Sequence, residues 1–120
     1  MSEVVFNPSK SPTVGVEVEA QIVDNTTGDL VNIAENIVNG FNNEDRVKHE
    51  LYLSTVEITS SPALDTNNTY EELSSIFKDV LNLANNNNAG LIATGTHPFA
   101  LYEDQVITNV NPRYEEFAQK

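Results

Sequence analysis

The stretch T-V-G-V-E-V-E-A-Q-I, residues 13–22, decides how we expect this chain to fold. Apolar and polar residues alternate along it. Because successive side chains of a β-strand point to opposite faces, this alternation predicts a strand with one apolar and one polar face. The apolar face is predicted to hold Val14, Val16, Val18, Ala20 and Ile22, and the polar face Glu17, Glu19 and Gln21.

Two glutamates side by side on one strand face repel each other. Such a pair is tolerated when solvent screens it, when the carboxylates share a proton, or when a hard cation such as Mg²⁺ or Mn²⁺ neutralises it through oxygen ligands. A single Glu-x-Glu pattern is more often a solvated strand face, so on these residues alone both interpretations stay open.

A second strand-like stretch, V-K-H-E-L-Y-L-S-T-V-E-I-T at residues 47–59, carries Glu50 and Glu57. Glu57 lies between two apolar residues and is therefore predicted on the same kind of polar face as Glu19. The odd separation places Glu50 and Glu57 on opposite faces of a regular strand. For both to serve one site, a bulge or bend near Ser54 and Thr55 is required, and otherwise Glu50 is simply exposed.

Helical spacing of apolar residues predicts a short helix over residues 33–41 and a longer one after it. The longer helix is predicted to begin at Thr69, which forms a capping-box pattern with Glu72. The asparagine run 85–88 and Gly90 are expected to end it. A buried strand over residues 91–96 should then lead to a turn at Thr96, His97 and Pro98.

Composition excludes several classes of partner and site. A chain of 120 residues suits one domain, and its formal net charge of −12 argues against binding to nucleic acid or to an anionic membrane surface. The chain has no cysteine, so disulfides and thiolate metal sites are excluded. Residues 1–12 form a leader without the pattern of a signal peptide, and no apolar run approaches membrane-spanning length, so we expect a cytoplasmic location.

Four motifs carry a resemblance to a known family. They are G-V-E-V-E-A-Q-I-V-D (15–24), H-E-L-Y-L-S-T-V-E-I (49–58), G-T-H-P-F-A-L-Y-E-D-Q (95–105) and N-P-R-Y (111–114). In this order and rough spacing, the chain resembles the opening portion of the carboxylate-amine ligases related to glutamate-cysteine ligase, the second glutamate-cysteine ligase group. The resemblance covers nearly the whole chain after residue 12.

The resemblance implies an α+β fold similar to the glutamine synthetase superfamily, with an antiparallel sheet and helices packed on one face. It implies Mg²⁺ or Mn²⁺ together with ATP as cofactors. The implied reaction forms an amide: ATP phosphorylates the side-chain carboxylate of glutamate, and an amine, cysteine in the best-known members, attacks the acyl phosphate. The implied metal ligands are Glu17, Glu19, Glu57 and Glu50, and the implied substrate-binding residues are Gly95, Thr96, His97 and Arg113.

Several of these residues have a second interpretation. His97, at a strand end before proline, either lines the substrate pocket or only hydrogen-bonds the local turn. Arg113 either faces a substrate carboxylate or phosphate, or pairs with a neighbouring carboxylate. His49, between Lys48 and Glu50, is expected on the surface. The residues give no basis for assigning a catalytic group.

Family members are much longer than this chain, so residues 13–120 are expected to form a single truncated ligase-like domain that is incomplete as a catalyst alone. A complementary ligase chain would then complete the site. Two alternatives remain: a non-catalytic module that binds glutamate or metal, and a remnant of the fold whose exposed strand edges favour a homo-oligomer.

Overall fold

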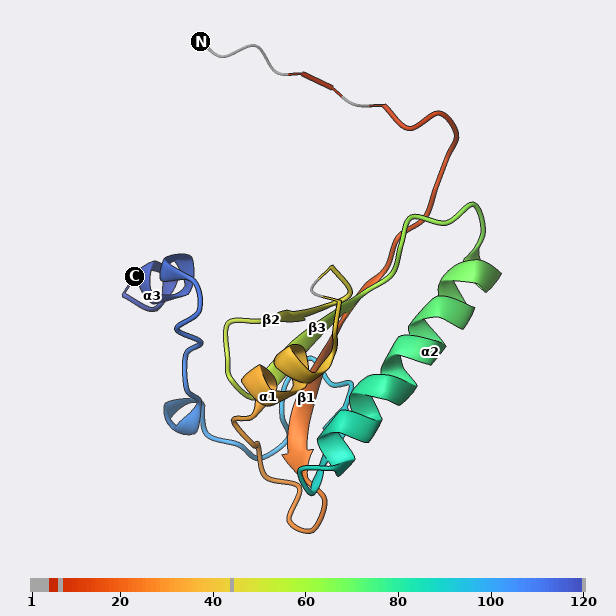
Figure 1. Cartoon of the computed structure of the whole chain (residues 1–120). Coiled ribbons are helices and arrows are strands. Elements are labelled where there is room, and N and C mark those ends of the chain that lie inside the picture. Colours follow the sequence, from red (N-terminus) through yellow and green to blue (C-terminus); the bar gives the residue numbers. More distant parts are fainter. Residues whose placement is uncertain (1–4, 7, 44, 120) are drawn as a thin grey trace.

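An antiparallel four-stranded sheet, with strand order β2-β3-β1-β4, forms the centre of the molecule in our computed structural model, which describes residues 5, 6, 8–43 and 45–119 (Figure 1). The strands are β1 (Glu17–Asp24), β2 (Val47–His49), β3 (Thr55–Thr59) and β4 (Ala89–Ile92). The helices are α1 (Ala34–Gly40), α2 (Thr66–Asn85), the 3₁₀ turn η1 (Tyr102–Asp104) and α3 (Pro112–Ala118). The predicted α+β class with an antiparallel sheet is confirmed.

Helices α1 and α2 cover one face of the sheet and enclose the hydrophobic core. Ala20 and Ile22 of β1 are fully buried there, whereas Glu17 and Glu19 are exposed. The predicted alternation of β1 is therefore correct. The regular strand begins only at Glu17. Residues 13–16 contact the segment that follows β3 instead, where Val14 and Ala63 exchange two backbone hydrogen bonds of 2.8 Å.

Residues 47–59 form two strands and not one bent strand, which corrects the sequence prediction. β2 ends at His49, the chain reverses through residues 50–54, and β3 returns antiparallel to β2. Lys48 pairs with Glu57 in this register. Because the reversal breaks the strand, the rule that an odd spacing separates Glu50 from Glu57 does not apply.

The N-terminus of α2 also differs from the prediction. Asp65, and not Thr69, is the N-cap, and its carboxylate accepts a hydrogen bond of 2.9 Å from the backbone N–H of Asn68. The Thr69 hydroxyl instead donates to the Asp65 carbonyl. Glu72 is bound to Ser61 and Arg46, so it does not close a capping box. The helix ends at Asn85, as the asparagine run predicts.

The chain after α2 returns to the sheet earlier than expected. β4 begins at Ala89 and ends at Ile92, so Gly90 is inside the strand and residues 93–96 are a loop. Residues 106–108 then run beside residues 51–53, where Leu53 N–H donates to Val106 O at 2.9 Å and Thr108 N–H to Leu51 O at 2.8 Å. No helix among the described residues is long and apolar enough to cross a membrane.

Candidate functional site

Three neighbouring strands place charged side chains in one row on the face of the sheet opposite the helices. Glu19 of β1 pairs with Glu57 of β3, and Glu57 pairs with Lys48 of β2. The Lys48 ammonium donates to Glu57 Oε1 at 2.9 Å, and the Thr59 hydroxyl donates to the same oxygen at 2.9 Å. Directly opposed like charges destabilise a sheet, so Lys48 offsets the repulsion between the two glutamates.

Glu50 lies beside this row, close enough to Glu57 and Glu19 for the three carboxyl groups to interact electrostatically. Burial raises the pKa of Glu50, and the negative charge of Glu19 and the contact with Glu57 raise it further. Burial alone would also raise the pKa of Glu57, but the hydrogen bonds from Lys48 and Thr59 outweigh it, and the pKa of Glu57 is lowered. Glu57 is therefore the more acidic carboxyl group of the two and Glu50 the less acidic.

A cavity of about 350 Å³ opens at one end of the row. β1, the turn after β2 and the loop after β4 form its walls. Its polar lining comes from Glu19, Gln21, Glu50, Thr55, Thr94, Gly95, Thr96, His97 and Gln105. No lysine or arginine of the described residues lines it. The cavity is therefore acidic, and an anionic ligand in it requires a positive charge from elsewhere.

His97 fastens the loop that forms one wall of this cavity. Its Nε2 is 2.9 Å from Gly28 O, and its Nδ1 accepts hydrogen bonds from the backbone N–H groups of Ala100 and Phe99, at 3.0 and 3.4 Å. These partners require a proton on Nε2 and none on Nδ1. His97 therefore lines the first cavity and stabilises the turn, and neither of its ring nitrogens is left free to act as a base; that it lines a substrate pocket stays a prediction.

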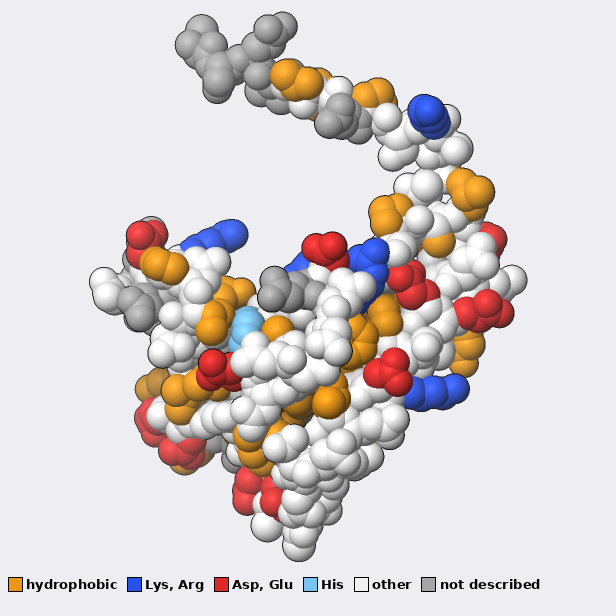
Figure 2. Space-filling model, in the orientation of Figure 1, with side chains coloured by type: hydrophobic (Ala, Val, Ile, Leu, Met, Phe, Trp, Pro, Cys, Tyr) orange, Lys and Arg blue, Asp and Glu red, His pale blue; other side chains and the backbone are white. Residues whose placement is uncertain are grey.

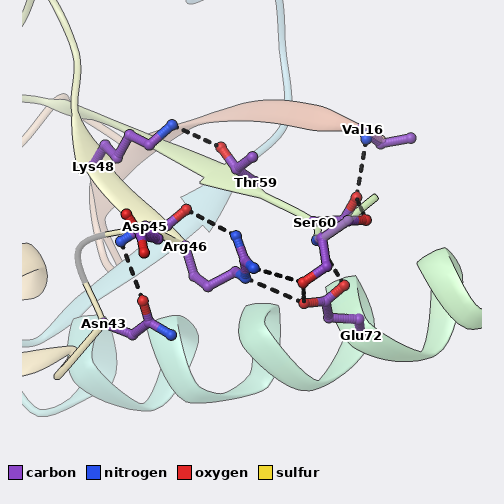
Figure 3. Close-up of polar contacts among 9 residues, drawn as sticks. Val16, Asn43, Asp45, Arg46, Lys48, Thr59, Ser60 and Glu72 are labelled. Carbon is purple, nitrogen blue, oxygen red and sulfur yellow. Dashed lines mark hydrogen bonds and ion pairs between the residues drawn. The ribbon is translucent and has the colours of Figure 1, made fainter. Parts of the chain in front are cut away.

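A second cavity of about 760 Å³ lies where β1 begins. Glu17, Asp45, Arg46, Lys48, Thr59 and Ser60 are among its lining residues. Figure 3 shows Arg46 reaching Glu72 of α2, while Lys48 points to Thr59. The Arg46 Nε lies 3.2 Å from Glu72 Oε1, and its Nη2 donates to the Ser61 hydroxyl at 2.6 Å. Both cations of this cavity thus already have acidic partners.

The structure brings most of the predicted site residues to this face. Glu19, Glu50, Gly95, Thr96 and His97 line the first cavity, Glu57 lies between the two cavities, and Glu17 lines the second.

Arg113 is not brought to either cavity. It is exposed on α3, with its guanidinium carbon 5.3 Å from the centre of the Phe117 ring. Its neighbour Tyr114 contacts the sheet instead, because its hydroxyl donates to His49 O at 3.1 Å. Burial and the nearby charge of Glu50 raise the pKa of Tyr114. His49 is partly exposed, but its Nδ1 is buried and finds no partner among the described residues.

The donor set of the acidic row fits Mg²⁺ in part. Within the residues that the structure describes, no three carboxylate or imidazole groups converge closely enough to hold an ion by themselves. Mg²⁺ is commonly bound by one or two carboxylates, with the remaining positions filled by water and substrate phosphates. Glu50 and Glu57, whose carboxyl groups influence each other's pKa, are such a pair, and Glu19 lies beside them.

Gln21, Thr94 and Gln105 line the first cavity but were not predicted as site residues. The Thr94 hydroxyl donates to Gln21 Oε1 at 2.9 Å, which leaves the Gln21 amide N–H₂ as a donor. Gln21 could have been found from the sequence, because it shares the polar face of β1 with Glu17 and Glu19. The other two lie in loops, where strand periodicity gives no signal.

Comparison with known proteins assigns the chain to a family. The model of glutamate-cysteine ligase family 2 matches residues 13–120. A protein of Mycolicibacterium vanbaalenii named "Putative glutamate--cysteine ligase 2-1" is 36% identical over 115 residues, which cover 96% of this chain and 30% of that protein. A protein of Clavibacter michiganensis named "Putative glutamate--cysteine ligase 2" is 33% identical over 115 residues, covering 93% of this chain and 30% of the relative. A protein of the same name from Leifsonia xyli is 31% identical over 125 residues, covering 100% and 33%.

This chain thus spans about a third of the length of the relatives it matches. The matched residues include the whole sheet, the acidic row and both cavities. The chain belongs to glutamate-cysteine ligase family 2.

Proposed function

We propose that this chain supplies one part of the active site of an ATP-dependent carboxylate-amine ligase that joins glutamate to an amine such as cysteine. The observation that carries the proposal is the row of Glu19, Glu57 and Lys48 with Glu50 beside it, at the mouth of a polar cavity. Within the proposal, the fold is of the glutamine synthetase type. Because the reaction consumes ATP, we place it in the cytoplasm.

The proposed reaction has two steps. The side-chain carboxylate of glutamate attacks the γ-phosphorus of ATP, which releases ADP and leaves an acyl phosphate. The amine nitrogen then attacks the acyl carbon, the phosphate leaves with the bonding electrons, and the nitrogen loses a proton to give the amide. Phosphoryl transfer depends mainly on position and on neutralised charge. Mg²⁺, when bound by the carboxylates of this face, would supply that neutralisation.

The residues of this chain have distinct roles in the proposal. Glu50 and Glu57 would hold the cation, with Glu19 beside them and the remaining ligand positions filled by water and substrate. When no cation is bound, the Lys48 ammonium offsets the negative charge of Glu57. The Gln21 amide, oriented by Thr94, offers a neutral donor to a substrate oxygen, and His97 holds the cavity wall in place. Neither ring nitrogen of His97 is available for proton transfer.

Calorimetric titration tests the proposal. The purified chain is titrated with Mg²⁺, and then with ATP and with glutamate in the presence of Mg²⁺. We expect saturable binding that is lost in the double variant Glu19→Gln/Glu57→Gln. Glu35→Gln is the matched control, since Glu35 is exposed in the first turn of α1, on the helix side of the sheet.

Three results would contradict the proposal: no binding of any of the three ligands, equal binding by the double variant, or equal loss in the control. Binding of glutamate that needs neither Mg²⁺ nor ATP would favour a non-catalytic glutamate-binding module instead. Mixing the chain with a complementary ligase polypeptide and measuring ADP release then distinguishes a ligase part from such a module.

A further inference from the structure

Tyr114 connects α3 to the sheet. The N-cap residue Asn111 sets the start of this helix, because its side-chain oxygen accepts a hydrogen bond of 3.0 Å from the Arg113 N–H. Arg113 and Phe117 are exposed, whereas Tyr114 is half-buried. Figure 1 shows the ribbon of α3 standing away from the sheet, and Figure 2 shows side chains, several of them apolar, filling the interval at the left of the view. The helix therefore presents the tyrosine of the N-P-R-Y motif, and not the arginine, to the rest of the molecule.

The hydrogen bond that Tyr114 makes lies directly before Glu50 in the chain. The Tyr114 hydroxyl donates to the carbonyl oxygen of His49 at 3.1 Å, across 65 positions of the sequence. His49 is the last residue of β2, where it pairs with Val56 of β3. The next residue is Glu50, which lines the first cavity. The hydroxyl therefore holds the backbone at the point where the chain leaves the sheet and enters the cavity wall.

The backbone on the other side of Glu50 is held as well. The Thr108 N–H donates to Leu51 O at 2.8 Å. The carboxylate of Glu50 turns back onto its own backbone, where its Oε2 accepts a hydrogen bond of 3.0 Å from the Leu51 N–H. Glu50 thus lies between two fixed points, His49 O and Leu51, and a shift of either point moves its carboxylate.

Tyr114 also lies near the carboxyl groups of the site. Burial raises the pKa of Tyr114, and the negative charges of Glu50 and Glu57 raise it further. A tyrosine with a raised pKa stays protonated at neutral pH, so its hydroxyl remains a donor. Because this proton is directed to His49 O, Tyr114 acts on the site through the backbone and not as an acid or base.

We infer that Tyr114 is a positioning residue of the proposed site: its hydroxyl holds the His49 carbonyl and thereby places the Glu50 carboxylate in the first cavity. The inference rests on the proposed function, in which Glu50 and Glu57 bind the cation. Mg²⁺ demands near-ideal ligand geometry, so a carboxylate whose backbone is free to shift binds it less tightly. One net hydrogen bond changes such an equilibrium about fivefold.

Amide hydrogen exchange and Mg²⁺ titration of the whole chain test the inference in Tyr114→Phe, which keeps the ring and removes the hydroxyl. The Leu51 N–H reports on Glu50 directly, because the Glu50 carboxylate is its acceptor. We expect exchange at Leu51 to become about fivefold faster and the Mg²⁺ affinity to fall about fivefold. The reference amide is that of Thr59, which donates to Arg46 O at 2.9 Å beyond the far end of β2, and its exchange should not change.

The matched control is Tyr102→Phe, which removes the hydroxyl of a tyrosine that is 77% exposed in η1 and should change neither measurement. Equal acceleration at Leu51 and Thr59 would mean that the Tyr114 hydroxyl only stabilises the fold as a whole, which overturns the inference. Unchanged exchange at Leu51, or the same changes in Tyr102→Phe, would overturn it too.

Failure of the proposed function gives a different result. A native chain that binds no Mg²⁺, with or without ATP, would refute the cation site, while exchange at Leu51 would still show whether Tyr114 holds Glu50 in place. Mg²⁺ binding that Tyr114→Phe leaves unchanged would refute the positioning role and leave the proposed function standing.

Discussion

At Gly90 of β4, a single neighbouring side chain, that of Asn25, obstructs the space that a Cβ would occupy. A Cβ built on Gly90 would lie 2.6 Å from Asn25 Oδ1, far inside van der Waals contact, while the next nearest atom outside Asn25 is a Val23 methyl at 4.0 Å. In Gly90→Ala, the Asn25 side chain must therefore move. It would give up hydrogen bonds from Nδ2 to Ala89 O, at 3.2 Å, and to Asn85 Oδ1, at 3.4 Å.

The expected free-energy change follows from these contacts. Loss of the part-buried bond to Ala89 O costs about 1 kcal/mol, and the longer exposed bond adds at most a few tenths. Alanine also lowers the entropy of the unfolded chain, which stabilises the protein by about 0.4 to 1 kcal/mol. Gly90→Ala should therefore be close to neutral or mildly destabilising in the native chain. In an Asn25→Ala background, where the obstruction is gone, it should stabilise by about 0.5 kcal/mol.

Urea unfolding of the four proteins in this double-mutant cycle measures the coupling directly. We expect a coupling energy of about 1 kcal/mol, with unchanged denaturant slopes. If Gly90→Ala has the same effect in both backgrounds, Asn25 does not lie over Gly90 and the reasoning is wrong. The loop that begins after β4 carries Thr94, Gly95 and Thr96, so calorimetry of ligand binding by the same variants would show whether the cavity wall moves too.

Three further predictions concern the core, acid stability and the cavity wall. Ile58 is fully buried in the core, so Ile58→Ala should lower the free energy of unfolding, measured by urea denaturation, by about 2 to 5 kcal/mol. Ile58→Val should lower it by about 1 kcal/mol. Equal effects of the two substitutions would show that the site collapses around the smaller residue. The hydroxyl of Ser61 lowers the pKa of Glu72 below its ordinary value of 4.5, with help from the Ser61 N–H and from Arg46. Stability from this contact is therefore present above pH 4.5 and lost as the pH falls through the lowered pKa, so an acid titration followed by fluorescence or circular dichroism should show a smaller loss in Glu72→Gln than in the native chain. His97→Ala removes the partner of Gly28 O and of two backbone N–H groups, and should lower the free energy of unfolding by about 1 to 3 kcal/mol; hydrogen exchange that stays slow at Phe99 and Ala100 would contradict this.

Strand periodicity predicted the part of the site that lies on β1. The alternation of residues 17–22 places Ala20 and Ile22 in the core and Glu19 on the open face, and both placements are confirmed. Local patterns were less reliable where a residue found a distant partner. Thr69 and Glu72 have the spacing of a capping box, but Glu72 binds Ser61 and Arg46, and Asp65 caps the helix instead.

Tertiary contacts decide the rest of the site. The spacing of Glu50 and Glu57 separates them on a single strand, yet the reversal after His49 brings their carboxylates together. The motif around Arg113 and Tyr114 drew attention to the arginine, whereas the helix places the tyrosine against β2 and leaves the arginine in solvent. Which residue of a short helix faces the protein depends on where the helix is anchored, and sequence spacing does not give that.

Glu57 lies between the two cavities and contacts a residue that lines each of them. Its Oε1 holds the Lys48 ammonium, which lines the second cavity, and its carboxyl group also meets Glu50, which lines the first. A cation that binds Glu50 and Glu57 would compete with Lys48 for the negative charge of Glu57. The Lys48 ammonium, once released from Glu57, would be able to pair with an anion in the second cavity. Through this contact we expect binding in one cavity to change the affinity of the other.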